Sequence, residues 1–123
     1  MSNNLILAVD DDPSVLMLVE TILSANGFTV ETAAGGVEAL EKLTLIKPSV
    51  VILDIMMPEV SGYDVILRMK QQVETQNIPV ILLSAKGEPD DLLKGYTEFG
   101  VEYYITKPFT QKQLLAGIKT VLG

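Results

Sequence analysis

The feature that most constrains the fold of this chain is an alternation between two hydrophobic periods. Five short apolar runs occur at residues 5–9, 28–32, 50–53, 80–83 and 103–105. Between them, and after the last one, apolar residues recur at the three- and four-residue spacing of an amphipathic helix. Strands that alternate with helices favour an α/β fold, in which a parallel sheet carries helices on both faces.

Five apolar stripes predict the helices. Their members are Val15, Leu18, Val19, Ile22 and Leu23; Val37, Leu40 and Leu43; Val65, Ile66, Met69 and Val73; Leu92, Leu93, Tyr96 and Phe99; and Leu114, Leu115, Ile118 and Leu122. Asp12 before Pro13 is typical of an N-cap followed by the first helical residue. Gly27 and Gly100 are placed where glycine commonly ends a helix.

The composition of the runs predicts where a site would lie. Those at residues 5–9, 50–53 and 80–83 are continuously apolar, which is typical of strands buried on both faces. The run at residues 28–32 interleaves polar residues and is expected to be an edge strand. Ligands of doubly wound sheets bind beyond the carboxyl ends of the strands, so the residues after each run are the candidates for function.

Length and composition narrow the class of protein. The 123 residues are expected to form one domain over 1–123, and 48% of them are hydrophobic. No apolar stretch is long enough to cross a membrane, and no basic secretory segment follows Met1. Cysteine is absent, so disulfides and thiolate metal sites are excluded, and a cytoplasmic location is expected. The net charge of −7 disfavours direct nucleic-acid binding by this domain.

Polar residues follow four of the five apolar runs. Asp10 and Asp11 follow the first, Asp54 the third, Ser84 the fourth and Lys107 the fifth. Carboxylates brought together at one end of a sheet repel one another, and a hard divalent cation bound between them relieves the repulsion. Carboxylate oxygens are ligands that Mg²⁺ prefers. Asp54 would then be an oxygen nucleophile, with a lysine charge and a serine donor beside it. The next acid along the chain, Asp12, is interpreted as the helix cap alone.

Four segments carry a resemblance to a known family. They are residues 6–13, 51–58 with 61–63 following, 79–85 and 104–109, in which the polar residues above are embedded. In this order and spacing they resemble the receiver domain of two-component response regulators, over essentially the whole chain. The resemblance implies a flavodoxin-like (βα)5 fold with a parallel five-stranded sheet in the order 2-1-3-4-5.

The resemblance also implies roles for individual residues. Asp54 would be the phosphoacceptor, helped by Lys107 and Ser84. The metal ligands would be Asp10, Asp11, Asp54 and the backbone carbonyl of Met56, around Mg²⁺ or its substitute Mn²⁺. Ser84 and Tyr104 would form the switch pair, and Pro108 would follow a cis bond that aims Lys107 at the site.

The implied partners are proteins. A sensor histidine kinase or a histidine phosphotransfer protein would supply the phosphoryl group, and because this chain has no histidine, any phosphohistidine must belong to the partner. An output partner or a second copy would bind the surface of the fourth helix, fifth strand and fifth helix. The residues assigned to this surface are Asp90, Asp91, Lys94, Glu98, Glu102, Tyr103, Lys112 and Lys119. No independent substrate turnover is expected.

In the family that this chain resembles, two positions flank the path of the water that removes the phosphoryl group, so the resemblance implies that they affect the lifetime of the phosphorylated form. They lie two residues beyond Asp54 and two beyond Ser84, and here they are Met56 and Lys86. Met56 cannot orient an attacking water, and Lys86 offers no acceptor lone pair when it is protonated, so slow self-dephosphorylation is expected.

Three other functions are alternatives to that of a phosphoacceptor domain. A haloacid-dehalogenase phosphatase would carry a second Asp where Met56 stands, and a flavodoxin would need a phosphate-binding loop in place of the acids after the first run. A receiver-shaped scaffold that is not regulated by phosphorylation usually lacks one of the acids or the lysine, and all are present here.

Overall fold

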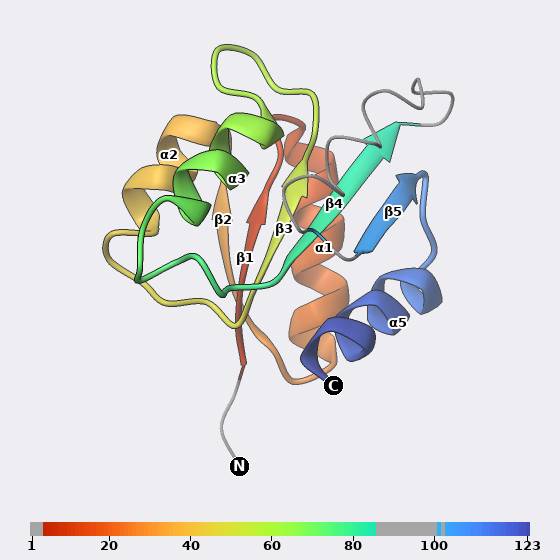
Figure 1. The fold of residues 1–123 in the computed structure, drawn as a ribbon. Coiled ribbons are helices and arrows are strands. Elements are labelled where there is room, and N and C mark those ends of the chain that lie inside the picture. The colour runs from red at the N-terminus through yellow and green to blue at the C-terminus, as the bar shows by residue number, and fades with distance from the viewer. Residues whose placement is uncertain (1–3, 86–100, 102) are drawn as a thin grey trace.

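The protein, seen in a computed structural model that describes residues 4–85, 101 and 103–123, is built on one five-stranded sheet (Figure 1). The strands are β1 (Leu5–Val9), β2 (Thr29–Ala33), β3 (Val50–Asp54), β4 (Val80–Ala85) and β5 (Tyr103–Lys107). All neighbours pair in parallel, in the order β2-β1-β3-β4-β5. The predicted flavodoxin-like sheet and its strand order are therefore confirmed.

Helices cover both faces of the sheet. The described residues form α1 (Pro13–Ala25), α2 (Gly36–Lys42), α3 (Gly62–Lys70) and α5 (Gln111–Leu122). Helices α2 and α3 lie on one face, and α1 and α5 lie on the other (Figure 1). The predicted fourth stripe, Leu92 to Phe99, and the predicted end at Gly100 lie outside the described residues. Within the described ranges, no helix is both long and apolar enough to span a membrane.

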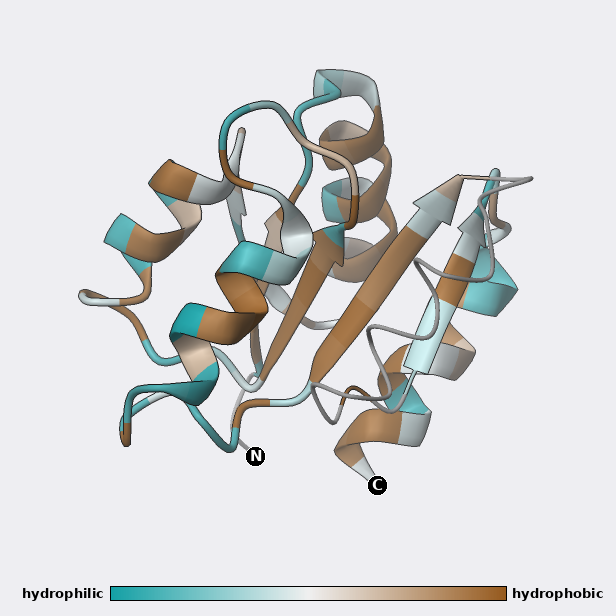
Figure 2. Cartoon of the chain, turned by 45° about the horizontal axis from the view of Figure 1, so that its top comes forward, coloured by the Kyte–Doolittle hydropathy of each residue, from teal (hydrophilic) through white to brown (hydrophobic). Residues whose placement is uncertain are grey.

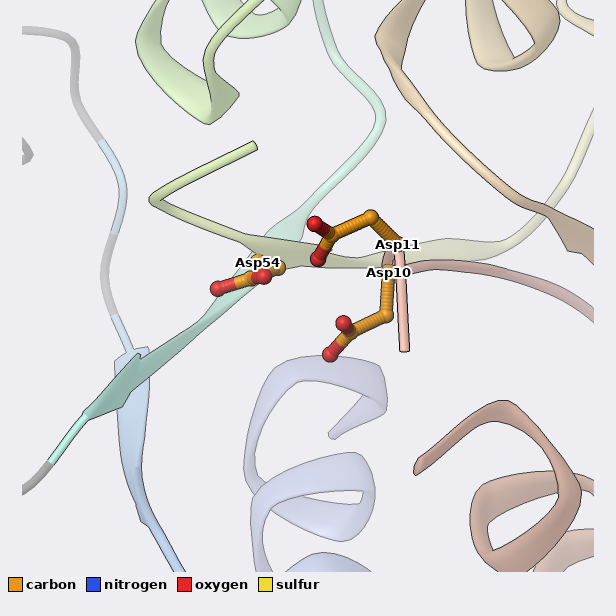
Figure 3. A group of neighbouring side chains, drawn as sticks. All are labelled: Asp10, Asp11 and Asp54. Atoms are coloured by element: carbon orange, nitrogen blue, oxygen red, sulfur yellow. The ribbon is translucent and has the colours of Figure 1, made fainter. Parts of the chain in front are cut away.

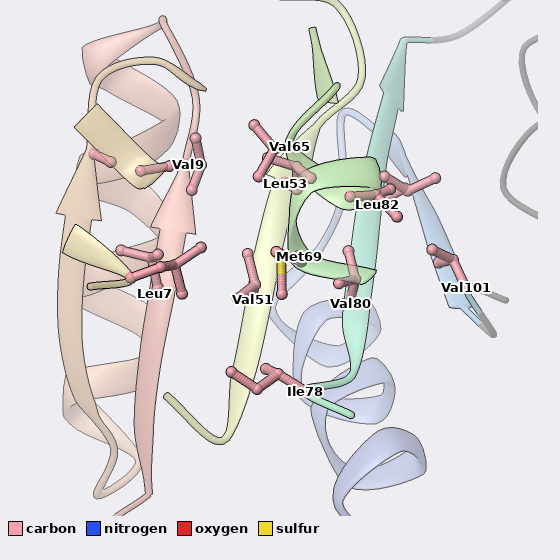
Figure 4. Packing of buried hydrophobic residues seen from close by; sticks show 14 of the residues in the cluster. Leu7, Val9, Val51, Leu53, Val65, Met69, Ile78, Val80, Leu82 and Val101 are labelled. Atoms are coloured by element: carbon pink, nitrogen blue, oxygen red, sulfur yellow. The ribbon is translucent and has the colours of Figure 1, made fainter. Parts of the chain in front are cut away.

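Alternate residues of each central strand feed two separate cores. Leu53 of β3 points into the core under α2 and α3, where it packs with Val65 and Met69 (Figure 4). Ile52 points the other way, into the core under α1 and α5. Every residue of β3 is buried, whereas β2 alternates between exposed and partly buried positions. The prediction of buried central strands and an edge strand at β2 is confirmed (Figure 2).

Helix boundaries follow the predicted signals where local chemistry sets them. The side chain of Asp12 caps α1 by accepting the Ser14 backbone N–H, and Pro13 is the first helical residue. After α1, Gly27 has a φ of 90° and donates its N–H to the Ser24 carbonyl, while Phe28 donates to the Leu23 carbonyl. This pair of bonds is the glycine-ended Schellman motif.

Several residues of the predicted apolar stripes are exposed and do not pack on the core. Leu18 is 45% exposed, and Leu16 is the residue that packs on the core, because Leu18 lies at the margin of the buried arc of α1. Val73 lies beyond the end of α3 at Lys70 and is exposed. Val37 also belongs to a predicted stripe and yet is half exposed at the start of α2.

The strands reach further toward their carboxyl ends than predicted. Strand β2 occupies residues 29–33 instead of 28–32, and β3, β4 and β5 end at Asp54, Ala85 and Lys107. The main-chain pairing therefore includes three of the predicted site residues, Asp54, Ser84 and Lys107, so their backbones are held by the sheet and not by loops.

Candidate functional site

Three carboxylates meet at the carboxyl end of the sheet. Asp10 follows β1 and is buried, Asp54 is the last residue of β3 and is 5% exposed, and Asp11 is exposed. One oxygen from each of the three lies within 4.8 Å of the others. Figure 3 shows the side chains converging from two neighbouring strands. The sheet order causes this convergence, because β1 and β3 are adjacent although 40 residues of chain separate them.

Lys107 joins the carboxylates from the far edge of the sheet. Its Nζ donates a 2.9 Å hydrogen bond to Oδ2 of Asp10 and lies 3.5 Å from Oδ1 of Asp54. The following Lys107–Pro108 peptide bond is cis, as expected. A charge-assisted bond to a buried carboxylate is among the stronger hydrogen bonds in proteins, so Lys107 fixes one side of the cluster.

The backbone holds Asp10 from the other side. Its Oδ1 accepts the Asp12 N–H at 2.9 Å, so both oxygens of Asp10 are engaged. Asp12 itself turns away from the cluster, because its Oδ1 accepts the backbone N–H and the hydroxyl of Ser14. Those bonds lower the pKa of Asp12. The interpretation of Asp12 as a helix cap is confirmed.

The electrostatics of the cluster centre on Asp54. Burial, and then the neighbouring charge of Asp10, raise the pKa of Asp54 to about 7, although Lys107 opposes the shift. Burial alone would lower the pKa of Lys107, but the hydrogen bond to Asp10 and the charges of the two aspartates outweigh it and raise that pKa. The cluster therefore holds more negative charge than one lysine neutralises.

The donor set fits a hard divalent cation. Carboxylate oxygens on a polar rim are the ligands that Mg²⁺ prefers, and a cation would relieve the repulsion that raises the Asp54 pKa. Asp11, exposed beside two buried acids, faces the solvent from which a hydrated ion would arrive. Met56 lies next to the cluster through its backbone, whose N–H lies 3.4 Å from Oδ1 of Asp54. The assignment of its carbonyl as a ligand stays a prediction.

Ser84 and Tyr104 lie on the same face of the sheet. In the β4–β5 register, Ser84 is opposite Thr106 and Leu82 is opposite Tyr104, so Ser84 and Tyr104 are diagonal neighbours. Ser84 is buried and Tyr104 is 39% exposed. This placement is compatible with a linked movement of the two side chains, which remains a prediction.

The placement of Tyr103 differs from the prediction that it belongs to an exposed output surface. Tyr103 is partly buried and packs against the core under α5, where a Cβ at Gly117 would lie 2.8 Å from its Cε2. The small residue in α5 makes room for the aromatic side chain. Of the other residues assigned to the output surface, Lys112 and Lys119 are exposed on α5. Asp90, Asp91, Lys94, Glu98 and Glu102 lie outside the described residues, as does Lys86.

A positioning contact at Gly62 was missed from the sequence. Gly62 begins α3 and donates its N–H to the Ile55 carbonyl at 2.9 Å. A Cβ at this position would lie 2.4 Å from the carbonyl oxygen of Asp54 and 2.9 Å from Cα of Ile55. The start of α3 is thus pressed against the backbone of the central acid. The only sequence signal for this contact was the glycine at position 62, and a glycine alone does not identify the backbone segment that approaches it.

Comparison with known proteins agrees with this geometry. Residues 6–119 match the sequence profile of the response regulator receiver domain. Among curated proteins, the "Probable transcriptional regulator ycf27" of Cyanophora paradoxa is 42% identical over 117 residues, which are 95% of this chain and 47% of that protein. The "Alkaline phosphatase synthesis transcriptional regulatory protein PhoP" of Bacillus subtilis is 38% identical over 98% of this chain and 49% of its own length. This chain spans about half the length of these relatives.

Solved structures show the same architecture. The chemotaxis protein CheY4 of Vibrio cholerae superimposes with a TM-score of 0.92 at 30% sequence identity, covering 98% of this chain and 100% of that one. A putative response regulator from Chloroflexus aurantiacus gives a TM-score of 0.91 at 32% identity, covering 98% of each chain.

Proposed function

Because this chain belongs to the response regulator receiver domain family, we propose that Asp54 accepts a phosphoryl group in a Mg²⁺-dependent reaction. The observation that carries the proposal is the buried Asp54 carboxylate, which shares a 4.8 Å cluster with Asp10 and Asp11 and contacts Lys107. A structural role alone does not account for three acids at the carboxyl ends of buried central strands, since their mutual repulsion opposes folding.

Each residue of the site has its own role in phosphoryl transfer. An oxygen of Asp54 forms the bond to phosphorus as the phosphorus–nitrogen bond of a partner's phosphohistidine breaks, and the released imidazole takes a proton from solvent. Lys107 stabilises the charge on the phosphoryl oxygens, and Ser84 donates a hydrogen bond to one of them. When bound by Asp10, Asp11, Asp54 and the Met56 carbonyl, Mg²⁺ supplies positive charge that lets a dianionic group approach these acids.

The partners follow from what the chain lacks and from its relatives. With no histidine of its own, the chain depends on a sensor histidine kinase or a histidine phosphotransfer protein as phosphodonor, in the cytoplasm. Its relatives are named transcriptional regulators and are about twice its length. We propose that phosphorylation changes the surface of the fourth helix, β5 and α5, and that a protein partner or a second copy binds there.

Intact mass spectrometry tests the proposal. The chain is incubated with acetyl phosphate and Mg²⁺, and the expected result is the mass gain of one phosphoryl group. Omission of Mg²⁺ with chelator present, or the substitution Asp54→Asn, should abolish the gain. An unmodified wild-type chain would instead favour a receiver-shaped scaffold that is not regulated by phosphorylation, and a phosphorylated Asp54→Asn chain would show that the acceptor is another residue.

A further inference from the structure

A trough runs between α2 and α3, on a face that the phosphoacceptor chemistry does not use. Its upper hollow, about 370 Å³, lies between the two helices and has apolar walls of Val37, Leu40, Leu43, Val60 and Met69. A second hollow of about 470 Å³ continues it past the ends of the helices and adds Leu45 and Ile46. The two hollows share Leu43, Thr44, Gln72 and Thr75, so they form one continuous depression. Figure 2 shows α2 and α3 side by side.

The rim of the trough exposes large apolar side chains. Leu45, which lines the lower hollow in the segment after α2, is 83% exposed. Val37, at the start of α2, is 51% exposed. Single exposed apolar residues are ordinary, but two of them on the walls of one apolar depression are typical of a surface that another protein covers.

Four charged side chains surround the same trough in a specific pattern. Glu41 and Arg68 line the upper hollow, and Lys47 and Glu74 line the lower one. On the α2 side the acid comes first and the base second, whereas on the α3 side the base comes first and the acid second. All four are exposed, and none forms an ion pair or side-chain hydrogen bond with another residue in the described ranges.

This alternation of charge makes the trough surface of one copy complementary to the same surface of a second copy. A two-fold axis that runs along the trough, in the plane of the surface, brings the α2 side of one copy opposite the α3 side of the other. Glu41 then faces Arg68 of the second copy, and Lys47 faces its Glu74. A surface of one predominant sign would repel its own copy, and at a net charge of −7 a local match is needed for two copies to approach.

We propose that the α2–α3 trough is a self-association surface, on which a second copy of this chain docks through reciprocal Glu41–Arg68 and Lys47–Glu74 pairs. The exposed Leu45 and Val37 supply apolar area, and the hollows receive side chains of the second copy. This surface lies across the sheet from α5, so it differs from the dimer expected through the fourth helix, β5 and α5. It does not depend on phosphorylation of Asp54.

Sedimentation velocity over a concentration series, without Mg²⁺ or phosphodonor, tests the proposal. The wild-type chain should shift from monomer toward dimer between about 10 µM and 1 mM. Glu41→Arg or Arg68→Glu alone places like charges opposite each other twice in a symmetric dimer, and either should weaken the dissociation constant by about tenfold. The double variant Glu41→Arg with Arg68→Glu exchanges the signs and should restore the constant to within about threefold of wild type.

The matched control is Glu20→Arg, a charge reversal on exposed α1, which should leave the dissociation constant unchanged. Circular dichroism confirms that each variant is folded, and Leu45→Ser provides a second test because it removes apolar area without adding charge. A chain that stays monomeric throughout the series would overturn the proposal. So would a dimer that Glu20→Arg disrupts while Arg68→Glu does not, or single variants that the double variant fails to rescue.

Discussion

At the scale of single residues, Asp54 shows a conflict between function and stability. A nucleophilic carboxylate has to be ionised, yet burial and the Asp10 charge raise its pKa from an ordinary value of 3.8 to about 7. The folded chain therefore holds a proton on Asp54 more tightly than the unfolded chain does. It follows that, without metal, the contribution of Asp54 to the free energy of unfolding decreases as the pH rises from about 4 to 7.

This conflict predicts that removing the charge stabilises the metal-free protein. In chelator at pH 8, Asp54→Asn should raise the free energy of unfolding by roughly 2 kcal/mol, since a neutral amide escapes both the desolvation and the repulsion. The difference should shrink toward pH 4, where Asp54 of the wild type is protonated. Urea unfolding at several pH values measures it.

The control for that measurement is Glu20→Gln, which removes one exposed negative charge from α1 and should change the free energy of unfolding little. Equal stabilities of Asp54→Asn and wild type at pH 8 would mean that Lys107 already neutralises the cluster. Adding Mg²⁺ should stabilise the wild type more at pH 8 than at pH 5, because the ion binds ionised carboxylates.

Met56 carries a second prediction at this scale. Its side chain is 59% exposed beside Asp54, where a polar group could hold a water in line with the phosphorus. Met56→Asn should therefore speed loss of the phosphoryl group several-fold after the donor is removed, followed by intact mass over time. Met17→Asn, which changes a similarly exposed methionine on α1, should leave the rate unchanged. A Met56→Asn rate equal to or slower than wild type would contradict the mechanism.

Much of the site could be placed from the sequence, for a physical reason. An acid or lysine at the carboxyl end of a strand has to lie on the rim of a parallel sheet, and the structure brings Asp10, Asp11, Asp54 and Lys107 together there. The sequence could not show that the Asp12 N–H holds the second oxygen of Asp10. That bond depends on the turn between β1 and α1 and not on the identity of residue 12.

At the scale of secondary-structure elements, Gly62 links α3 to the phosphoacceptor strand. Gly62→Ala would place a Cβ 2.4 Å from the Asp54 carbonyl oxygen, so the helix or the strand end has to move. We expect the free energy of unfolding to fall by about 2–4 kcal/mol, with a lower rate of phosphorylation by acetyl phosphate. Urea unfolding and a time course of intact mass measure the two effects.

Gly35→Ala is the matched control for that element. A Cβ at Gly35 would meet nothing within 4 Å, and its φ of −178° is open to any residue, so the stability should change by less than about 1 kcal/mol. If Gly62→Ala were as mild as Gly35→Ala, the close approach of α3 to β3 would not be rigid.

Some helix and strand positions predicted from the sequence differ from those in the structure. Periodicity placed the described strands and helices, because a two-sided sheet requires continuous apolar strands and one-sided helices. It misplaced Leu18 and Val73, since a stripe has no sharp edge and an apolar residue just past a helix end continues the pattern by chance. Strand ends were underestimated because polar site residues interrupt the apolar run while the backbone pairing goes on.

At the scale of the whole molecule, two surfaces differ in their expected response to phosphorylation. The core under α2 and α3 includes Leu53, next to Asp54, and also Leu82, which shares its face of β4 with Ser84. Side chains at the β4–β5 end of that face can therefore respond to the state of Asp54. The trough between α2 and α3 instead depends on charges that the site does not contact.

This difference between the two surfaces predicts how the protein changes on activation. Hydrogen exchange measures the change when Mg²⁺ and beryllofluoride, which mimics a phosphoryl group on Asp54, are added. A bond from Ser84 to the mimic should draw that side chain inward and let the neighbouring Tyr104 ring follow, so amide protection should change across residues 86–119. Helix α2 should be unaffected. The change should be partial and reversible, since a ligand shifts an equilibrium only by its differential affinity for the two states. Asp54→Asn should show no change, and protection changes confined to the loop at residues 55–61 would mean that β5 and α5 are not the output surface.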